Sequence, residues 1–194
     1  MPNSNGVRFS KAVFVKSAKS EDQFLLDLPL FTFIGRSNVG KSTLINNVLE
    51  QKNLMKSSKT PGLTRMVNYC LVDDSFYIAD VPGYGYASLE RDYFYELMSA
   101  FLTKSTNLRC VYILVDSRRL LKEADLEFMD FLSQTGTPYA IVFTKTDQLS
   151  AKEKYALKQC EKSLEARFSF FETDTKKKDS FAPLRKDIKN RLKL

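Results

Sequence analysis

The sequence predicts an α/β fold: a mostly parallel sheet of six or seven strands, with one antiparallel strand and helices on both faces. Strand patterns alternate with helix patterns along most of the chain, which is typical of a parallel sheet. Continuous apolar runs such as "CVYILVD" at 110–116 indicate strands that are buried on both faces. With 194 residues, 43% of them hydrophobic and 27% charged, we expect one folded domain.

The expected strands are the apolar, aromatic and β-branched runs at 12–18, 30–34, 66–72, 75–80, 110–116, 139–143 and 168–171. Asp73 and Asp74 separate the third run from the fourth as a tight polar turn. These two strands therefore form a hairpin, and one strand of the sheet is antiparallel. The polar stretch at 51–65, with Pro61 and Gly62, predicts a mobile loop.

Apolar residues three or four positions apart predict the helices. Ser150 and Glu153 fit a capping box that opens one of them. The helix after Pro183 carries one apolar stripe and is otherwise basic. The expected helical segments are 41–49, the segment holding Leu97, Phe101 and Leu102, 123–134, 150 toward 168, and the segment holding Leu184, Ile188 and Leu192.

Composition excludes several kinds of active site. The chain has no histidine, and Cys70, Cys110 and Cys160 form no C-x-x-C pair, so Ser-His-Asp triads and the usual zinc sites cannot be built. Catalysis must use carboxylates, backbone groups, lysine or a metal ion. No apolar run reaches the ~18 residues of a membrane span, and the start "MPNSNGVRFS" lacks a signal-peptide pattern. We expect a cytoplasmic protein without stable membrane insertion.

A phosphate-binding loop is predicted at 35–42, where "GRSNVGKS" matches G-x-x-x-x-G-K-[ST] between a strand and a helix. Backbone N–H groups and the helix N-terminus attract phosphate, while the lysine reaches the terminal phosphates and the serine can ligate Mg²⁺. A plain glycine turn is the alternative, but the flanking strand and helix favour a nucleotide site. Its predicted residues are Gly35, Arg36, Ser37, Asn38, Val39, Gly40, Lys41 and Ser42.

A second glycine loop follows the strand at 75–80. Asp80 ends that strand, where an acid can bind Mg²⁺ through water, and Gly83 offers a backbone N–H for a γ-phosphate. An aspartate in this place is often only a turn residue. Together, Asp80, Val81, Pro82 and Gly83 nevertheless resemble the D-x-x-G switch of GTPases.

The segment Thr144, Lys145, Thr146, Asp147 follows the strand at 139–143 and reads T-K-x-D. A carboxylate here accepts hydrogen bonds from N1–H and the 2-amino group of guanine, whereas adenine would leave it unpaired. The stem of Lys145 can lie over the purine. The order of the three motifs therefore predicts GTP and GDP, rather than ATP, as ligands.

At the level of families, the chain resembles EngB, also called YihA or YsxC, a family of bacterial ribosome-assembly GTPases related to translation factors. The likeness covers about 10–194. The residues that carry it are "GRSNVGKSTLIN", "KTPGLTR", "DVPGYGYA", "VDSRR", "TKTD" and "LRKDI". The resemblance implies a P-loop GTPase (G-domain) fold over 1–194, with a short extension at 1–10 and a basic C-terminal helix at 181–194.

The resemblance also implies site residues that the motifs alone do not define. Thr64 would ligate Mg²⁺ and sense the γ-phosphate, within a nucleotide-covering segment formed by Gly62, Leu63, Thr64, Arg65 and Met66. A guanine-contacting loop would comprise Thr173, Asp174 and Thr175, although "TDT" replaces the family's "FSS" and Ser180 its usual glycine.

Hydrolysis is expected to be slow, because Tyr84 follows Gly83 where Ras-like enzymes carry a water-orienting glutamine. Asn38 stands where potassium-activated GTPases carry an asparagine, so K⁺ is a candidate cofactor beside Mg²⁺; a purely structural role for Asn38 is the alternative. The expected catalytic residues are Lys41, Thr64, Gly83 and Asn38, and the expected magnesium ligands are Ser42, Thr64 and, through water, Asp80.

The net charge of +7 is concentrated at 176–194 and 51–65. Such regions suit RNA phosphates, although a lysine-rich helix is often only solvated surface. The resemblance favours the large ribosomal subunit and its rRNA, and implies a monomeric GTP switch needed for assembly, cell division and septation. The alternative is a nucleotide-sensing binding module for a cell-division or membrane partner, with incidental hydrolysis.

Overall fold

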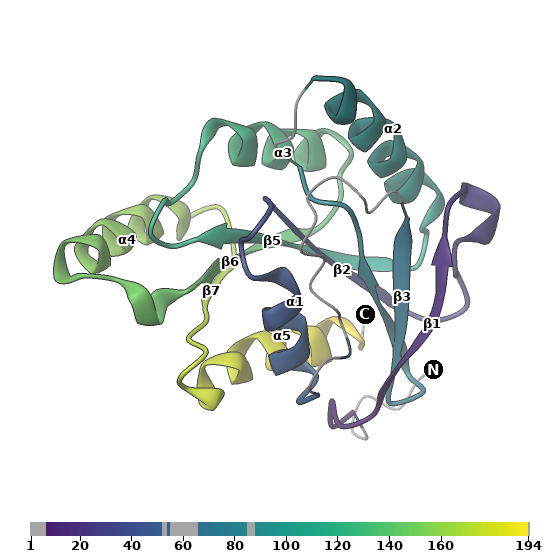
Figure 1. Cartoon of the computed structure of the whole chain (residues 1–194), viewed down its shortest axis with the longest axis horizontal. Helices are drawn as coiled ribbons and strands as arrows, with labels where there is room; N and C mark the ends of the chain where they lie inside the picture. Colours follow the sequence, from purple (N-terminus) through teal and green to yellow (C-terminus); the bar gives the residue numbers. More distant parts are fainter. Residues whose placement is uncertain (1–6, 52–53, 55–65, 85–87, 194) are drawn as a thin grey trace.

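The structure, a computed structural model, describes residues 7–51, 54, 66–84 and 88–193 (Figure 1). Within these residues, seven strands form one sheet in the order β1-β3-β4-β2-β5-β6-β7. The strands are β1 (Ala12–Ala18), β2 (Leu30–Gly35), β3 (Val67–Val72), β4 (Phe76–Asp80), β5 (Leu108–Asp116), β6 (Tyr139–Thr144) and β7 (Phe170–Glu172). All neighbours are parallel except that β3 runs antiparallel to both β1 and β4. The predicted fold class is confirmed.

Helices cover both faces of this sheet, and each face has its own hydrophobic core. The helices are α1 (Lys41–Val48), α2 (Ser88–Lys104), α3 (Glu123–Gln134), α4 (Ala151–Leu164) and α5 (Ala182–Arg191). In Figure 1, α2 and α3 lie over one face, and α1 and α5 lie together over the other. Residues of α2, α3 and α4 share one core cluster, and those of α1 and α5 share the second. In the described part of the chain, no helix is both long enough and apolar enough to cross a bilayer.

The β3–β4 hairpin has the tight polar turn that its sequence predicts, with residues 73–75 between the paired Val72 and Phe76. Asp73 and Asp74 both adopt left-handed backbone conformations, with φ of 46° and 52°. A tight turn with two positive φ angles matches the right-handed twist of the strands that it joins. The Asp73 carboxylate also accepts hydrogen bonds from the backbone N–H groups of Arg8, Phe9 and Lys11. The turn thereby fixes the segment that leads into β1.

Helix α4 begins as predicted but ends earlier. The N–H of Ser150 donates to Glu153 Oε2 at 2.8 Å and the N–H of Glu153 to Ser150 Oγ at 3.4 Å, which completes the capping box. The helix stops at Leu164 instead of continuing toward Phe168. The chain must turn there to enter β7 parallel to β6, and the ring of Phe168 stacks on Tyr139 with centroids 5.4 Å apart.

Two polar contacts fix α5 against the sheet and α1. Tyr112, on the inner strand β5, donates its hydroxyl to Asp187 Oδ2 at 2.7 Å, and the same oxygen accepts from Arg191 Nε at 2.8 Å. The guanidinium of Arg185 donates to the carbonyls of Asn47 and Val48, the last residues of α1. The last carbonyls of a helix lack the usual intrahelical partners, so Arg185 acts as a cap for the C-terminus of α1, where the carbonyl of Asn47 also accepts from the N–H of Glu50 at 3.2 Å.

Replacing Tyr112 by Phe tests the first of these contacts. A hydrogen bond to a charged group contributes about 1.5–3 kcal/mol, so Tyr112→Phe is expected to lower the unfolding free energy by about that amount. Urea denaturation followed by circular dichroism measures it. Tyr155→Phe is the matched control: that side chain is 69% exposed, and the change should be below about 0.5 kcal/mol. Equal effects of the two substitutions would contradict this role of Tyr112.

Candidate functional site

The three sequence motifs meet at one edge of the sheet. Gly35, Asp80, Asp116 and Thr144 end the strands β2, β4, β5 and β6. These strands are parallel neighbours, and the register pairs Asp116 with Thr144. Ligands of open parallel sheets bind outside the carboxyl ends of the strands. The arrangement therefore has the position of a nucleotide site.

The loop between β2 and α1 has the backbone geometry of a phosphate cradle. Gly40 has φ +100°, a left-handed conformation that lets α1 begin directly at Lys41. The N-terminus of α1 therefore faces the same edge of the sheet, with its positive dipole end. Within the described residues, the hydroxyl of Ser42 has no hydrogen-bond partner, which leaves it available to a metal ion.

The loop after β4 presses directly on this cradle. A Cβ atom on Gly83 would lie 2.4 Å from the carbonyl oxygen of Gly35, so only glycine fits there. The ammonium of Lys41 lies 2.5 Å from Asp80 Oδ1 and also donates to the carbonyl of Val81. Lys41, which the sequence assigns to phosphate, and Asp80, which it assigns to magnesium, are therefore adjacent.

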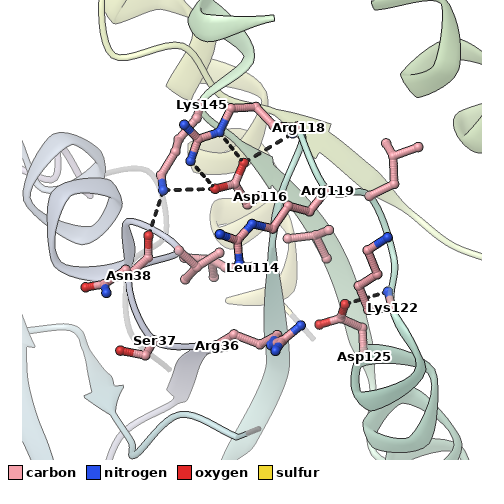
Figure 2. A pocket seen from close by; sticks show the side chains of 13 residues that line it. Arg36, Ser37, Asn38, Leu114, Asp116, Arg118, Arg119, Lys122, Asp125 and Lys145 are labelled. Atoms are coloured by element: carbon pink, nitrogen blue, oxygen red, sulfur yellow. Dashed lines mark hydrogen bonds and ion pairs between the residues drawn. The ribbon is translucent and has the colours of Figure 1, made fainter. Parts of the chain in front are cut away.

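Lys145 connects the T-K-x-D segment to the phosphate loop (Figure 2). Its ammonium donates to the carbonyl of Asn38 at 2.7 Å and to Asp116 Oδ2 at 2.9 Å. Thr144 Oγ1 donates to the carbonyl of Val39 at 2.7 Å. The two motifs lie about a hundred residues apart in the chain, and these bonds bring them side by side.

Asp116 is a site residue that sequence reasoning did not assign. Burial alone would raise its pKa, but hydrogen bonds from Arg118 and from Lys145 outweigh burial and lower the pKa well below its usual range. The carboxylate is therefore ionised and orients Lys145. Its sequence signal was the same as that of Asp80: an acid that directly follows a buried apolar strand.

Asp147 lies buried with an unused oxygen. Its side chain is 6% exposed, Oδ1 has no hydrogen-bond partner within the described residues, and Oδ2 is 3.8 Å from the ammonium of Lys176. A buried acceptor without a partner costs about 1–3 kcal/mol, and more if it is charged. A ligand that brings two adjacent N–H donors would remove this cost, and the Watson–Crick edge of guanine has that pattern.

The loop Thr173–Thr175 lies beside the T-K-x-D segment, because the N–H and hydroxyl of Thr146 both donate to the carbonyl of Thr173. The N–H groups of Thr173 and Asp174 are already used, by Phe143 O and Ser180 Oγ. Of the three residues, only Thr175 has an N–H without an acceptor in the described part of the chain. Thr175 is thus the donor of this loop that remains for a base.

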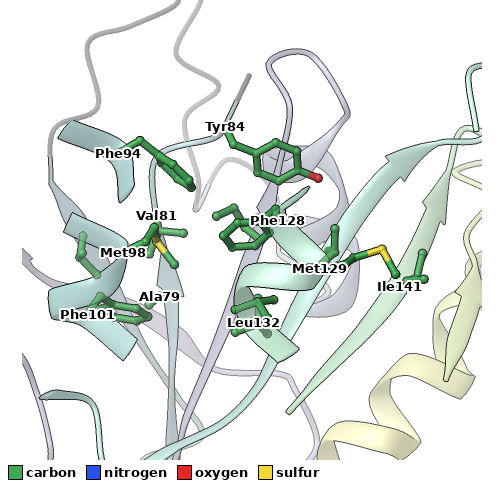
Figure 3. Packing of buried hydrophobic residues seen from close by; sticks show 14 of the residues in the cluster. Ala79, Val81, Tyr84, Phe94, Met98, Phe101, Phe128, Met129, Leu132 and Ile141 are labelled. Carbon is green, nitrogen blue, oxygen red and sulfur yellow. The ribbon is translucent and has the colours of Figure 1, made fainter. Parts of the chain in front are cut away.

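Tyr84 does not reach the reaction site. It is 3% exposed, its hydroxyl donates to Asp125 Oδ1 at 2.7 Å, and its ring stacks on Phe128 with centroids 5.0 Å apart (Figure 3). Burial, together with the charge of Asp125, raises its pKa far above the usual range. The side chain therefore packs among the core residues of α3 and is not available to orient a water molecule. Residues 62–65 of the predicted nucleotide-covering segment lie outside the described residues. Met66, the last residue of that segment, is half-buried just before β3.

Comparisons with known proteins agree with this site. The family model described as 50S ribosome-binding GTPase matches residues 31–145. A protein of Chlorobaculum tepidum named "Probable GTP-binding protein EngB" is 45% identical over 129 residues, covering 65% of this chain and 67% of the relative. Its namesake in Chlorobium phaeobacteroides is 38% identical over 168 residues, covering 84% and 88%.

Solved structures support the same fold. A crystal structure of a probable GTP-binding protein engB aligns with a TM-score of 0.66 at 22% identity, covering 84% of this chain and 98% of that one. A structure of Era in complex with MgGDPNP and nucleotides 1506–1542 of 16S ribosomal RNA aligns with a TM-score of 0.58 at 20% identity, covering 87% and 57%. The chain belongs to the EngB family of GTP-binding proteins, and it is a GTPase that binds GTP and GDP.

Proposed function

We propose that this protein is a single-domain, monomeric GTP switch that acts in assembly of the large ribosomal subunit and is needed for normal cell division and septation. The observation that carries the nucleotide part is the buried, unpartnered oxygen of Asp147 beside the glycine cradle. The ribosomal part is supported by the family description, 50S ribosome-binding GTPase, and by an exposed basic surface. In this proposal the GTP form docks on the maturing subunit, and hydrolysis releases it.

Guanine is recognised at the T-K-x-D segment. Asp147 accepts from N1–H and the 2-amino group, and the stem of Lys145 covers one face of the base. The N–H of Thr175 donates to the hydrogen-bond acceptor that remains on the guanine base. Adenine would present no pair of donors to Asp147, so its binding would leave a buried carboxylate unpaired.

The phosphates bind at the cradle of residues 35–42. Backbone N–H groups and the N-terminus of α1 face the phosphate oxygens, and Lys41 moves from Asp80 to the β- and γ-phosphates. Mg²⁺, when bound, neutralises charge on the phosphates. Ser42 would ligate it directly, Asp80 through water, and Thr64 from the nucleotide-covering segment. With Lys41 engaged by phosphate, Asp80 is free for this role.

Hydrolysis depends on Gly83 and on a cation near Asn38. Gly83 offers its N–H to the γ-phosphate from a position fixed against Gly35. Because Tyr84 is buried, no side chain next to Gly83 orients water, and intrinsic turnover is slow. The exposed side chain of Asn38 could hold K⁺ against the phosphates, which would supply the positive charge that an arginine finger gives elsewhere.

The basic surface consists of the exposed lysines Lys176, Lys177, Lys178, Lys186 and Lys193. Arg185 and Arg191 carry charge in the same region but are used inside the fold, so they do not belong to this surface. Lysines on an exposed loop and helix suit the phosphates of structured RNA, which they contact without reading sequence. The proposed partner is therefore ribosomal RNA of the large subunit.

Asp147→Asn tests base recognition. The amide can donate where the carboxylate only accepts, so GTP affinity is expected to fall about a hundredfold, or about 3 kcal/mol, while affinity for xanthosine triphosphate rises. Competition against a fluorescent guanine nucleotide measures both. The nucleotide-free variant should also unfold at a higher temperature than wild type, because it no longer buries a carboxylate oxygen that lacks a hydrogen-bond partner. If ATP competes with wild type as well as GTP does, the assignment of Asp147 is wrong.

Neutralising part of the basic surface tests the ribosomal partner. Lys178→Gln, Lys186→Gln and Lys193→Gln together should weaken co-sedimentation with large subunits and reduce the slope of log affinity against log salt by about 2 to 3. The control variant carries Lys152→Gln, Lys154→Gln and Lys162→Gln on the exposed face of α4 and should bind as wild type does. GTP affinity should be unchanged in both variants.

The same subunits separate the switch from a binding module with incidental hydrolysis. Large subunits should strongly stimulate GTP turnover of the wild-type protein. If large subunits do not stimulate GTP turnover, and if binding of the protein to its partner does not depend on salt, the binding module would be favoured.

Potassium activation has its own test. Turnover in KCl should exceed turnover in NaCl at equal ionic strength by about tenfold, equivalent to about 1.4 kcal/mol, and Asn38→Ala should remove the difference. Nucleotide affinity of the variant, measured in parallel, shows whether the loop itself is intact. Identical rates of the wild type in the two salts would eliminate K⁺ as a cofactor.

A further inference from the structure

A separate cavity of about 150 Å³ lies between the phosphate loop and the segment that joins β5 to α3 (Figure 2). Its walls come from residues 36–39, 114–116, 118–120, 122 and 125, and Lys145. Arg36, Ser37, Asn38 and Val39 of the phosphate loop, together with Lys145, form one wall of it. The other residues proposed to contact the nucleotide and magnesium do not line it, namely Gly40, Lys41, Ser42, Asp80, Gly83, Asp147 and Thr175. The cavity therefore borders the proposed nucleotide site, with the phosphate loop and Lys145 as the shared wall, and its remaining walls belong to the segment between β5 and α3.

Positive charge is in excess around this cavity. Its lining has five cationic side chains and two carboxylates: Arg36, Arg118, Arg119, Lys122, Lys145, Asp116 and Asp125. Both carboxylates already have partners. Asp116 accepts from Arg118 and Lys145, and Asp125 accepts from the hydroxyl of Tyr84 and the N–H of Lys122.

Three cations remain without a counter-charge. Within the described chain, the side chains of Arg36, Arg119 and Lys122 make no hydrogen bond or ion pair. Figure 2 shows the guanidinium groups of Arg36 and Arg119 in the space between the phosphate loop and the start of α3. Leu120 has φ +55°, an unfavourable conformation for leucine, so the turn that carries Arg119 is strained.

We propose that this cavity binds a phosphate group, either inorganic phosphate or the phosphate of a small phosphomonoester. Two guanidinium groups and an ammonium can donate several charge-assisted hydrogen bonds to one tetrahedral dianion. The volume is below the ~300 Å³ at which sites for larger organic ligands begin. A phosphate with at most a small substituent therefore fits, and a whole nucleotide does not.

The bound phosphate would act on the switch through Asp125. That carboxylate lines the cavity and accepts the hydroxyl hydrogen bond of Tyr84, the residue next to Gly83. An anion placed in the cavity repels the Asp125 carboxylate and thereby changes the strength of its hydrogen bond with Tyr84. The cavity is thus coupled to the loop that contacts the γ-phosphate.

Equilibrium dialysis with radiolabelled inorganic phosphate, and in a second arm with ribose 5-phosphate, tests the site. The protein is first saturated with a non-hydrolysable GTP analogue and Mg²⁺, so that the cradle of residues 35–42 is filled. One saturable site is expected per chain. Arg119→Gln with Lys122→Gln should weaken binding about tenfold or more, because two of the three free cations are lost. Both side chains are exposed, and Asp125 uses the backbone N–H of Lys122, so the fold should persist.

The control variant carries Lys152→Gln with Lys154→Gln, the same change of charge on exposed positions of α4, and should bind phosphate as wild type does. Tighter binding of ribose 5-phosphate than of inorganic phosphate would identify a phosphomonoester as the ligand, and the reverse order would identify inorganic phosphate. Absence of saturable binding at millimolar phosphate, equal weakening in both variants, or displacement of the GTP analogue would overturn the proposal. If the nucleotide assignment is wrong, the protein will not bind the GTP analogue in the first step of the experiment, before phosphate is added.

Discussion

The contacts of Lys145 are the ones on which the site depends most. In the proposed site a nucleotide bridges the T-K-x-D segment and the phosphate loop, which are far apart in the chain, and the ammonium of Lys145 joins them through Asn38 and Asp116. Since both partners are backbone or carboxylate oxygens, the lysine is satisfied before any ligand arrives. The distance between the two halves of the site is therefore set by the protein, and binding need not supply the free energy to assemble it.

The second constraint is the close approach of the two glycine loops. The backbone at Gly83 packs on the carbonyl of Gly35, while the next side chain, that of Tyr84, is fixed in the core by Asp125 and Phe128. One end of this loop thus lies at the proposed phosphate site, and the other is part of the packing between α3 and the sheet. Movement of Gly83 would disturb the buried hydrogen bond between Tyr84 and Asp125. The position of Gly83 and the packing of Tyr84 are therefore energetically linked.

The sequence predicted the sheet, the helices on its two faces and the common edge of the motifs, because hydrophobic periodicity and strand ends are local signals. It did not predict the role of Asp116, because that depends on which strand lies beside β6. The contact between Gly83 and Gly35 and the burial of Tyr84 likewise depend on tertiary packing. The end of α4 was misplaced because the helical pattern continues past Leu164, whereas the geometry of β7 requires a turn.

The guanidinium of Arg185 has a consequence for communication across the molecule. Helix α1 has eight residues, about 12 Å, with the phosphate cradle at its first turn and Arg185 at its last. If α5 can shift relative to α1, a ligand that prefers one placement of α5 will also change how well Arg185 orders the last turn of α1. Thermodynamic reciprocity then requires that filling the cradle alter the affinity of α5 for that ligand by the same factor.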